Sequence, residues 1–114
     1  MEENLGADSM GIIDNLEKML ASGRDSALLR YSLGVEYHKK GDLDSSAMHL
    51  SSAVEQDAAY SAAWKAYGKV LAEAGRGEDA AQAWQTGIEV AERNGDIQAA
   101  KEMKVFLRRI QKSQ

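Results

Sequence analysis

Apolar residues recur at intervals of three and four along most of this chain, which is the spacing that forms one face of an α-helix. The first stretch of this kind runs from about Ser9 to Ser22, and its apolar face consists of Ile12, Ile13, Leu16, Met19 and Leu20. Comparable stretches follow to the end of the sequence, separated by short turns. The pattern therefore predicts an all-α domain of about six helices.

Glycine and aspartate mark the expected ends of these helices. Glycine tolerates the left-handed backbone that closes many helices, and small polar side chains cap the free amides where a helix begins. Ser9 and Asp25 are the predicted N-caps of the first two helices, and Asp96 is the predicted N-cap of the last. The predicted terminators are Gly23, Gly41, Gly75 and Gly95.

The middle of the sequence repeats itself with a period of 34 residues. The matched pairs are Leu33 with Tyr67, Gly34 with Gly68, Gly41 with Gly75, Leu50 with Trp84, and Ala53 with Gly87. In a helical hairpin the small residues let two helix backbones approach, and the large residues fill the remaining space. The period therefore predicts two stacked helical hairpins.

These residues resemble the tetratricopeptide repeat (TPR) family, whose motif joins a Trp-x-x-Leu-Gly-x-x-Tyr helix to an Ala-x-x-x-Phe helix. Repeat one, about residues 27–60, carries Leu33, Gly34, Tyr37, Gly41, Leu43, Leu50 and Ala53. Repeat two, about residues 61–94, carries Trp64, Tyr67, Gly68, Leu71, Gly75, Ala80 and Trp84. The resemblance implies an array of helical hairpins that holds segments of other proteins on its inner, concave surface.

Four positions depart from the TPR motif. Arg30 replaces the tryptophan of repeat one and Ser46 replaces its alanine, while Ala58 and Glu92 stand where the motif closes with proline. The residues that form the core pairs are kept. Without the prolines we expect either a less rigid turn between hairpins or second helices that continue somewhat further.

Two repeats alone would be marginally stable, because each hairpin needs neighbours to bury its apolar face. We expect the first helix to cover repeat one, and a capping helix over about residues 96–112 to cover repeat two. The apolar face of this capping helix consists of Ala99, Met103, Phe106, Leu107 and Ile110. Lys101 and Glu102 occupy the predicted positions of the Leu-Gly pair. The expected organisation is a flexible segment 1–8 followed by one domain, 9–112.

Composition narrows the functional classes. The 114 residues include 14 Lys and Arg against 18 Asp and Glu, and this net charge of −4 argues against a protein held mainly by nucleic acid or by an anionic membrane. The sequence has no cysteine, no proline and no apolar stretch long enough to span a membrane. We therefore expect a cytoplasmic helical protein that binds neither nucleic acid nor membrane.

The sequence offers little material for catalysis or for a cofactor. His38 and His49 lack metal-ligand spacing with the neighbouring acids, and we expect the first to line the inner surface and the second to pack between hairpins. Two acidic pairs, Asp42 with Asp44 and Glu78 with Asp79, stand where acids cap helix starts. We expect no enzyme activity, no metal and no cofactor.

The candidate partner-binding residues lie on the first helices of the two hairpins. In repeat one a second apolar stripe, separate from the core stripe, is made by Leu28, Tyr31, Val35 and His38. In repeat two Lys65 and Lys69 stand over small residues at the corresponding positions. An acidic or C-terminal peptide of another protein would suit this surface. Two alternatives stay open, in which the N-terminal helix covers the stripe or a second copy pairs with it as a homodimer.

Overall fold

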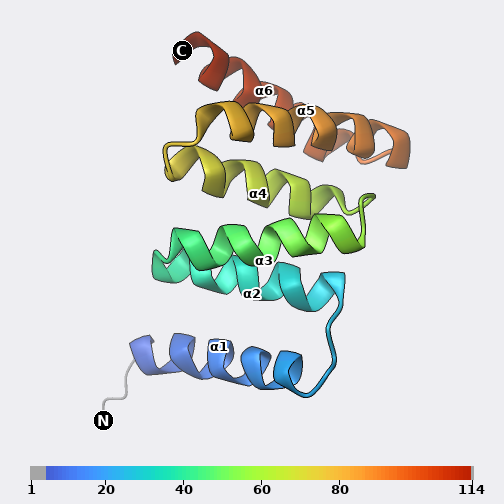
Figure 1. The fold of residues 1–114 in the computed structure, drawn as a ribbon. Coiled ribbons are helices and arrows are strands. Elements are labelled where there is room, and N and C mark those ends of the chain that lie inside the picture. Colours follow the sequence, from blue (N-terminus) through green and yellow to red (C-terminus); the bar gives the residue numbers. More distant parts are fainter. Residues whose placement is uncertain (1–4, 114) are drawn as a thin grey trace.

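The computed structural model of the protein describes residues 5–113 and consists of six α-helices in an elongated stack of 45 × 29 × 21 Å (Figure 1). The all-α prediction is confirmed, since no strand occurs among these residues. The helices are α1 (Leu5–Ala21), α2 (Ala27–Lys40), α3 (Leu43–Gln56), α4 (Ser61–Glu73), α5 (Gly77–Asn94) and α6 (Ile97–Ser113). No helix in the described part of the sequence is long and apolar enough to cross a membrane.

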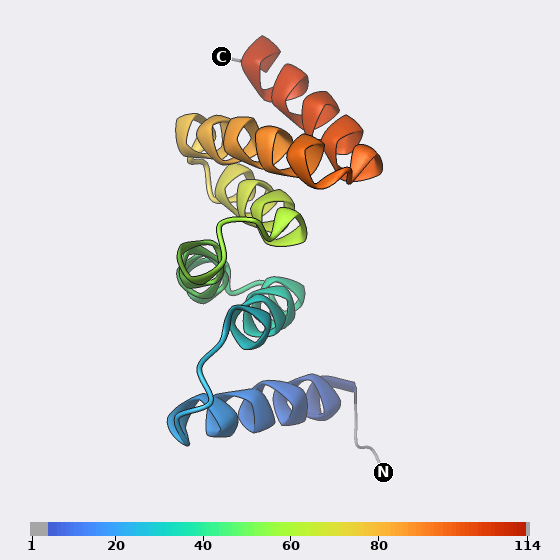
Figure 2. The same cartoon turned by 90° about the vertical axis from the view of Figure 1, so that its right-hand side faces the viewer.

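The helices pack mainly against their neighbours in the sequence. Helices α2 and α3 form one hairpin and α4 and α5 form the next, while α3 joins the two hairpins by packing on α4. Helix α6 covers the second hairpin through contacts with α5 and α4. Helix α1 packs on α2 at the other end of the stack (Figure 1). In the view of Figure 2, α2 and α4 lie on one side of the stack and α3 on the other.

The helix ends follow the predicted chemistry with two exceptions. All four predicted terminators, Gly23, Gly41, Gly75 and Gly95, have a positive φ. The carboxylate of Asp96 accepts the amide of Ala99 and so caps α6 as predicted. The predicted N-cap at Asp25 is wrong, because the hydroxyl of Ser26 accepts the amide of Leu29 and caps α2 instead.

The predicted start of the first helix is also wrong. Helix α1 begins at Leu5, before the expected N-cap Ser9, so part of the segment 1–8 is helical. The rest of that segment, residues 1–4, lies outside the described residues.

Glycines allow the close contacts inside each hairpin. A Cβ atom at Gly34 would collide with the Leu50 side chain, and one at Gly68 would collide with the Trp84 indole. Trp84 itself is buried in a cluster that also contains Leu71, Ala80 and Met103. The pairing of small with large residues that the period predicted is therefore the packing that builds the core.

The register of α6 differs from the prediction. The N-caps of α2, α4 and α6 are Ser26, Tyr60 and Asp96. The number of residues from the α4 cap to the α6 cap is therefore two greater than the number from the α2 cap to the α4 cap. Helix α5 has 18 residues where α3 has 14, and a shorter turn compensates only part of the difference. Met103 therefore takes the place of Leu33 and Tyr67, and the assignment of Lys101 and Glu102 to the Leu-Gly positions is wrong.

Replacing Gly68 with alanine should lower the free energy of unfolding by about 1–3 kcal/mol, because the new methyl group has no room beside Trp84. Urea denaturation followed by circular dichroism measures this change. The matched control is Gly11→Ala in α1, where no atom lies within 4 Å of the added Cβ. That substitution should stabilise the helix by up to about 1 kcal/mol. Equal effects at the two glycines would contradict this account of the hairpin packing.

Candidate protein interaction surface

Helix α4 packs against both α2 and α6, and these three helices form the face that we call the inner face. Three side-chain contacts tie it together. His38 of α2 bonds Glu73 of α4, while Lys65 and Lys69 of α4 reach Glu102 and Phe106 of α6. Leu28, Tyr31 and Val35 precede His38 at helical spacing on α2 and share its side of that helix. The structure thus brings the six sequence-predicted residues to one face.

The apolar part of the inner face is open at one end. The side chain of Leu28 is 66% exposed, so α1 does not cover it. Tyr31 is half-buried: its ring lies 5.0 Å from that of Tyr60 and packs against Ala53, Val54 and Ala63. Val35 is half-buried as well. Leu28 is therefore the most accessible apolar residue of the predicted set, and Tyr31 also supports the core.

The charged part of the inner face is already partly paired. The ammonium group of Lys65 lies 2.5 Å from the Glu102 carboxylate, and this hydrogen bond, with a second from Gln98, lowers the pKa of Glu102. Lys69 is exposed, and its ammonium group lies 5.7 Å from the centre of the Phe106 ring. His38 and Glu73 pair at 2.8 Å. Of the two lysines that the sequence analysis selected, only Lys69 keeps a cation without a carboxylate partner among the described residues.

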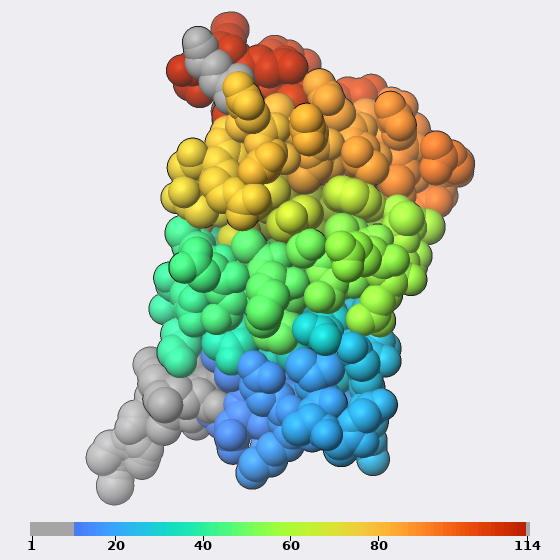
Figure 3. Space-filling model, viewed as in Figure 1, coloured from blue at the N-terminus to red at the C-terminus, as the bar shows by residue number. Residues whose placement is uncertain are grey.

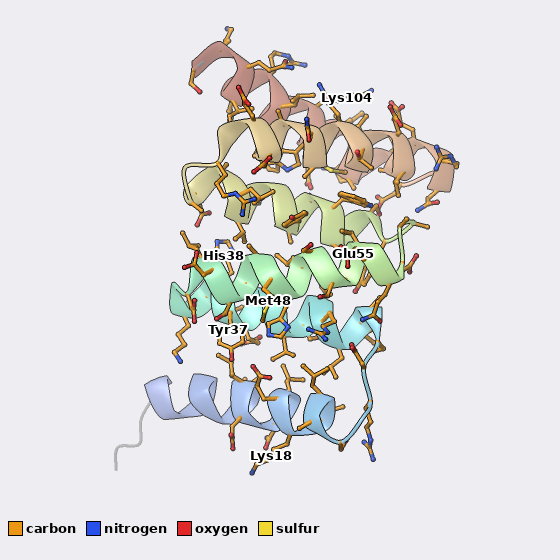
Figure 4. The ribbon with its side chains drawn as sticks, in the orientation of Figure 1. Lys18, Tyr37, His38, Met48, Glu55 and Lys104 are labelled. Carbon is orange, nitrogen blue, oxygen red and sulfur yellow. The ribbon has the colours of Figure 1, made fainter. Side chains whose placement is uncertain are left out.

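The opposite side of the stack carries an exposed residue that the sequence analysis missed. Met48 on α3 is 54% exposed and faces the viewer in Figure 4. It lines a shallow hollow of about 330 Å³ together with Ala47, Ser51 and Tyr67. The space-filling view in Figure 3 shows this side of the molecule. Met48 stands outside the repeat motif, so the motif gave no reason to select it.

A polar cluster around the buried His49 joins α1 to the first hairpin. The Tyr37 hydroxyl donates to Glu17 of α1 at 2.5 Å, and the Tyr37 ring stacks on His49 of α3. Arg30 donates to Nδ1 of His49 at 3.2 Å and binds Asp25 through two hydrogen bonds of 2.9 Å. In Figure 4 Tyr37 lies between α2 and α1. The prediction that His49 packs between the hairpins is therefore wrong, because His49 lies between α1 and the first hairpin.

The cluster shifts the acidity of its members in different directions. Hydrogen bonds from Arg30 and then Gln56 hold the pKa of Asp25 well below its usual range. The hydrogen bond to Glu17 raises the pKa of Tyr37 to about 12. Burial is the main reason why the pKa of His49 is lowered, and the charge of Arg30 adds to it while Glu17 opposes it.

No family model matches the sequence. A TPR repeat-containing protein of Pseudomonas aeruginosa is 50% identical over 102 residues, which cover 90% of this chain and 97% of that protein. The chain belongs to the TPR family. TPR repeats generally serve as protein interaction modules and as scaffolds without catalytic activity.

Solved structures agree with this assignment. The solution structure of a protein from Bordetella parapertussis is 43% identical, with a TM-score of 0.77, covering 90% of this chain and 89% of that one. The crystal structure of the MamA protein is 23% identical, with a TM-score of 0.72, and shares the fold; the match covers 91% of this chain and 59% of MamA.

Two of the four departures from the TPR motif are matched by side-chain hydrogen bonds. In the first repeat Arg30 takes the place of the motif tryptophan, and its guanidinium is satisfied by Asp25 and His49. Ser46 replaces the motif alanine, and its buried hydroxyl donates to the Gly34 carbonyl at 2.6 Å. In the proline position of the first repeat, the Ala58 carbonyl accepts the Trp64 indole N–H at 2.9 Å. The two side-chain replacements, Arg30 and Ser46, are thus matched by hydrogen bonds. The Ala58 carbonyl would also be present in a proline, and nothing in the structure explains Ala58 or Glu92 at the proline positions.

The polar groups of this TPR domain do not converge on a reaction centre in the part that the structure describes. His38 and His49 belong to separate clusters, one on the inner face and one beneath α1. No group of three or more histidine, aspartate or glutamate side chains among the described residues could hold a metal ion. These polar groups instead connect helices to one another.

Proposed function

We propose that the protein is a non-catalytic adaptor that binds a segment of a partner protein on its inner face. The observation that carries the proposal is the 66% exposure of Leu28 on the same side of α2 as Tyr31 and Val35. An exposed leucine beside a half-buried tyrosine offers an apolar surface that a partner's side chain can contact. A cytoplasmic site of action belongs to this proposal and is supported by a sequence without cysteine.

The charges of the inner face favour a partner segment that is acidic or that ends in a free carboxylate. Lys69 is exposed and can meet a carboxylate without losing a salt bridge within this protein. Lys65 can do so only by sharing its ammonium group with Glu102. The partner's apolar side chains would therefore contact Leu28 and Val35, and its carboxylate would lie near Lys69.

Replacing Leu28 with serine should weaken partner binding about tenfold, which corresponds to about 1.4 kcal/mol. Lysate from the source cell is passed over the immobilised protein, the retained partner is identified by mass spectrometry, and its affinity is measured with purified components. Because Leu28 is exposed, its replacement should leave the thermal unfolding midpoint unchanged. Tyr31→Ala is a poorer probe, since loss of the packing on Tyr60 would also lower stability.

The matched control is Met48→Ser, which removes a comparably exposed apolar side chain from α3 on the other side of the stack. It should leave partner affinity unchanged. If Met48→Ser weakens binding and Leu28→Ser does not, the binding site is on the outer side and the proposal fails.

The second candidate function is self-assembly through the same face. It is favoured by the exposure of Leu28, which α1 leaves open for another copy to cover. The mass of the purified protein in solution separates the two candidates. A homodimer that dissociates in the Leu28→Ser variant would support self-assembly, and a monomer would support the adaptor.

A further inference from the structure

We propose that copies of the protein associate through two different surfaces, with α6 of one copy lying against the outer side of α3 of the next. Each of these helices carries a stripe of exposed side chains, and neither stripe belongs to the apolar part of the inner face. The proposal therefore does not depend on the proposed function of that face. It rests on the spacing of the side chains in each stripe, on their exposure, and on the charge that each helix carries.

The acidic stripe runs along the outer side of α3. Its members are spaced by four, three and four residues, so they lie on one line along the helix: Asp44, Met48, Ser51 and Glu55. Met48 is 54% exposed, and both acids are exposed as well; Met48 and Glu55 are labelled in Figure 4. Helix α3 contains no lysine or arginine. Arg76 borders the same hollow as Asp44, but it is paired with Asp79 at 2.9 Å. The stripe thus presents a carboxylate at each end and an apolar side chain between them.

The basic stripe runs along the solvent side of α6, at one end of the stack (Figure 1). Its members have the same spacing and are all exposed: Lys101, Val105, Arg108 and Lys112. Helix α6 carries five bases and one acid, although the whole protein has a net charge of −4. That acid, Glu102, lies on the inner face and binds Lys65. Lys104, beside the stripe, pairs with Glu92, whereas the three cations of the stripe form no salt bridge with any described residue.

The two stripes are complementary when the helices run parallel. Both span 11 residues, which is about 16 Å at the rise of an α-helix. In that orientation two pairs of opposite charge and one apolar pair form: Asp44 with Lys101, Glu55 with Lys112, and Met48 with Val105. In the antiparallel orientation Met48 would face Arg108, and the apolar pair would be lost. Charge complementarity of this kind fixes the register of a contact, so the side chains favour the parallel arrangement.

The second repeat gives α5 a similar pair of acids. Glu78 and Glu89 are exposed and are also 11 residues apart. Between them Gln82 takes the place that Met48 has on α3, so the apolar pair with α6 would be missing. Helix α3 is therefore the better acceptor, and the two acids of α5 provide a matched control.

The expected association is weak and open-ended. A contact between two different surfaces leaves one stripe of each kind free, so further copies can join. Exposed ion pairs contribute little each and are screened by salt. Association should therefore grow with protein concentration, and its affinity should fall several-fold when NaCl is raised from about 50 mM to about 300 mM.

Sedimentation equilibrium of two charge-reversed variants tests the proposal on the whole chain. One variant carries Asp44→Lys with Glu55→Lys, and the other carries Lys101→Glu with Lys112→Glu. Each variant alone should be monomeric, because the ends of its two stripes then have charges of the same sign. An equal mixture of the two should associate again, because the reversed stripe of each variant is complementary to the reversed stripe of the other. All four side chains are exposed, so both variants should keep the helical circular dichroism spectrum.

The matched control carries Glu78→Lys with Glu89→Lys. It changes the formal net charge from −4 to 0, as the reversal on α3 does, and it should associate like the unchanged protein. Leu28→Ser, which alters the inner face, should also associate like the unchanged protein.

Three results would overturn the proposal. The first is an unchanged protein that stays monomeric at low salt and high concentration, and the second is a mixture of the two reversed variants that stays monomeric. The third is association that is lost in the α5 control or in Leu28→Ser, which would place the contact on α5 or on the inner face. If the variant with Asp44→Lys does not fold, Glu55→Lys and Lys112→Glu, each alone and then mixed, test the same pairing at one end of the contact.

Discussion

Replacing Trp84 with alanine should lower the free energy of unfolding by about 3–5 kcal/mol, the largest loss that we expect from a single substitution in this protein. Trp84 is 4% exposed, fills the space above Gly68 and lies 5.3 Å from the ring of Phe106. Its indole N–H donates to the Lys65 carbonyl at 3.3 Å. The substitution therefore removes contacts to α4 and α6 together and leaves a cavity where three helices meet.

Urea denaturation measures this loss, and the second tryptophan of the sequence provides its control. Trp64 is only half-buried, and its indole N–H bonds the Ala58 carbonyl near the surface. Trp64→Ala should therefore cost clearly less than Trp84→Ala. A larger loss for Trp64→Ala would show that the hairpin core is not centred on Trp84.

Replacing Met103 with alanine should lower the free energy of unfolding by about 2–5 kcal/mol. Met103 of α6 is fully buried and packs against Gly87 of α5. It takes the helical position that Leu33 and Tyr67 hold in the two repeats. Thermal and urea unfolding of the variant measure the loss.

Lys101→Ala is the control for Met103→Ala, because Lys101 is exposed and should change stability by no more than about 0.5 kcal/mol. This pair of variants tests the register of α6. If Lys101→Ala is the more damaging change, the two-residue shift of α6 is wrong and the strict period of 34 continues to the end of the sequence.

The hairpins could be predicted because their packing is encoded by residue pairs at a fixed separation. A glycine in the first helix and a large residue in the second fit each other in both repeats, as Gly34 with Leu50 and Gly68 with Trp84 show. The register of α6 could not be predicted in this way. The register of α6 depends on the length of α5, and the sequence has no proline to mark where α5 ends.

Helical spacing was enough to predict that Leu28, Tyr31 and Val35 share one side of α2. The charge pairs around them could not be predicted in the same way. The pairing of Lys65 with Glu102 joins residues 37 positions apart and depends on the shifted register of α6, so the sequence did not reveal it. The sequence did not reveal the hydrogen bond between Glu17 and Tyr37 either, because it depends on how α1 packs on α2.

The order in which the helices are synthesised determines when each part of the core can become buried. Contacts between neighbouring helices dominate, and such local topologies fold quickly. Helix α2 has its main partners, α1 and α3, as soon as residue 56 has left the ribosome. The second hairpin must wait for α6, since Phe106 and Met103 cover Trp84 and Gly87. A nascent polypeptide that stops before α6 would expose Trp84, because α6, which shields this side chain, is made after the hairpin that it covers.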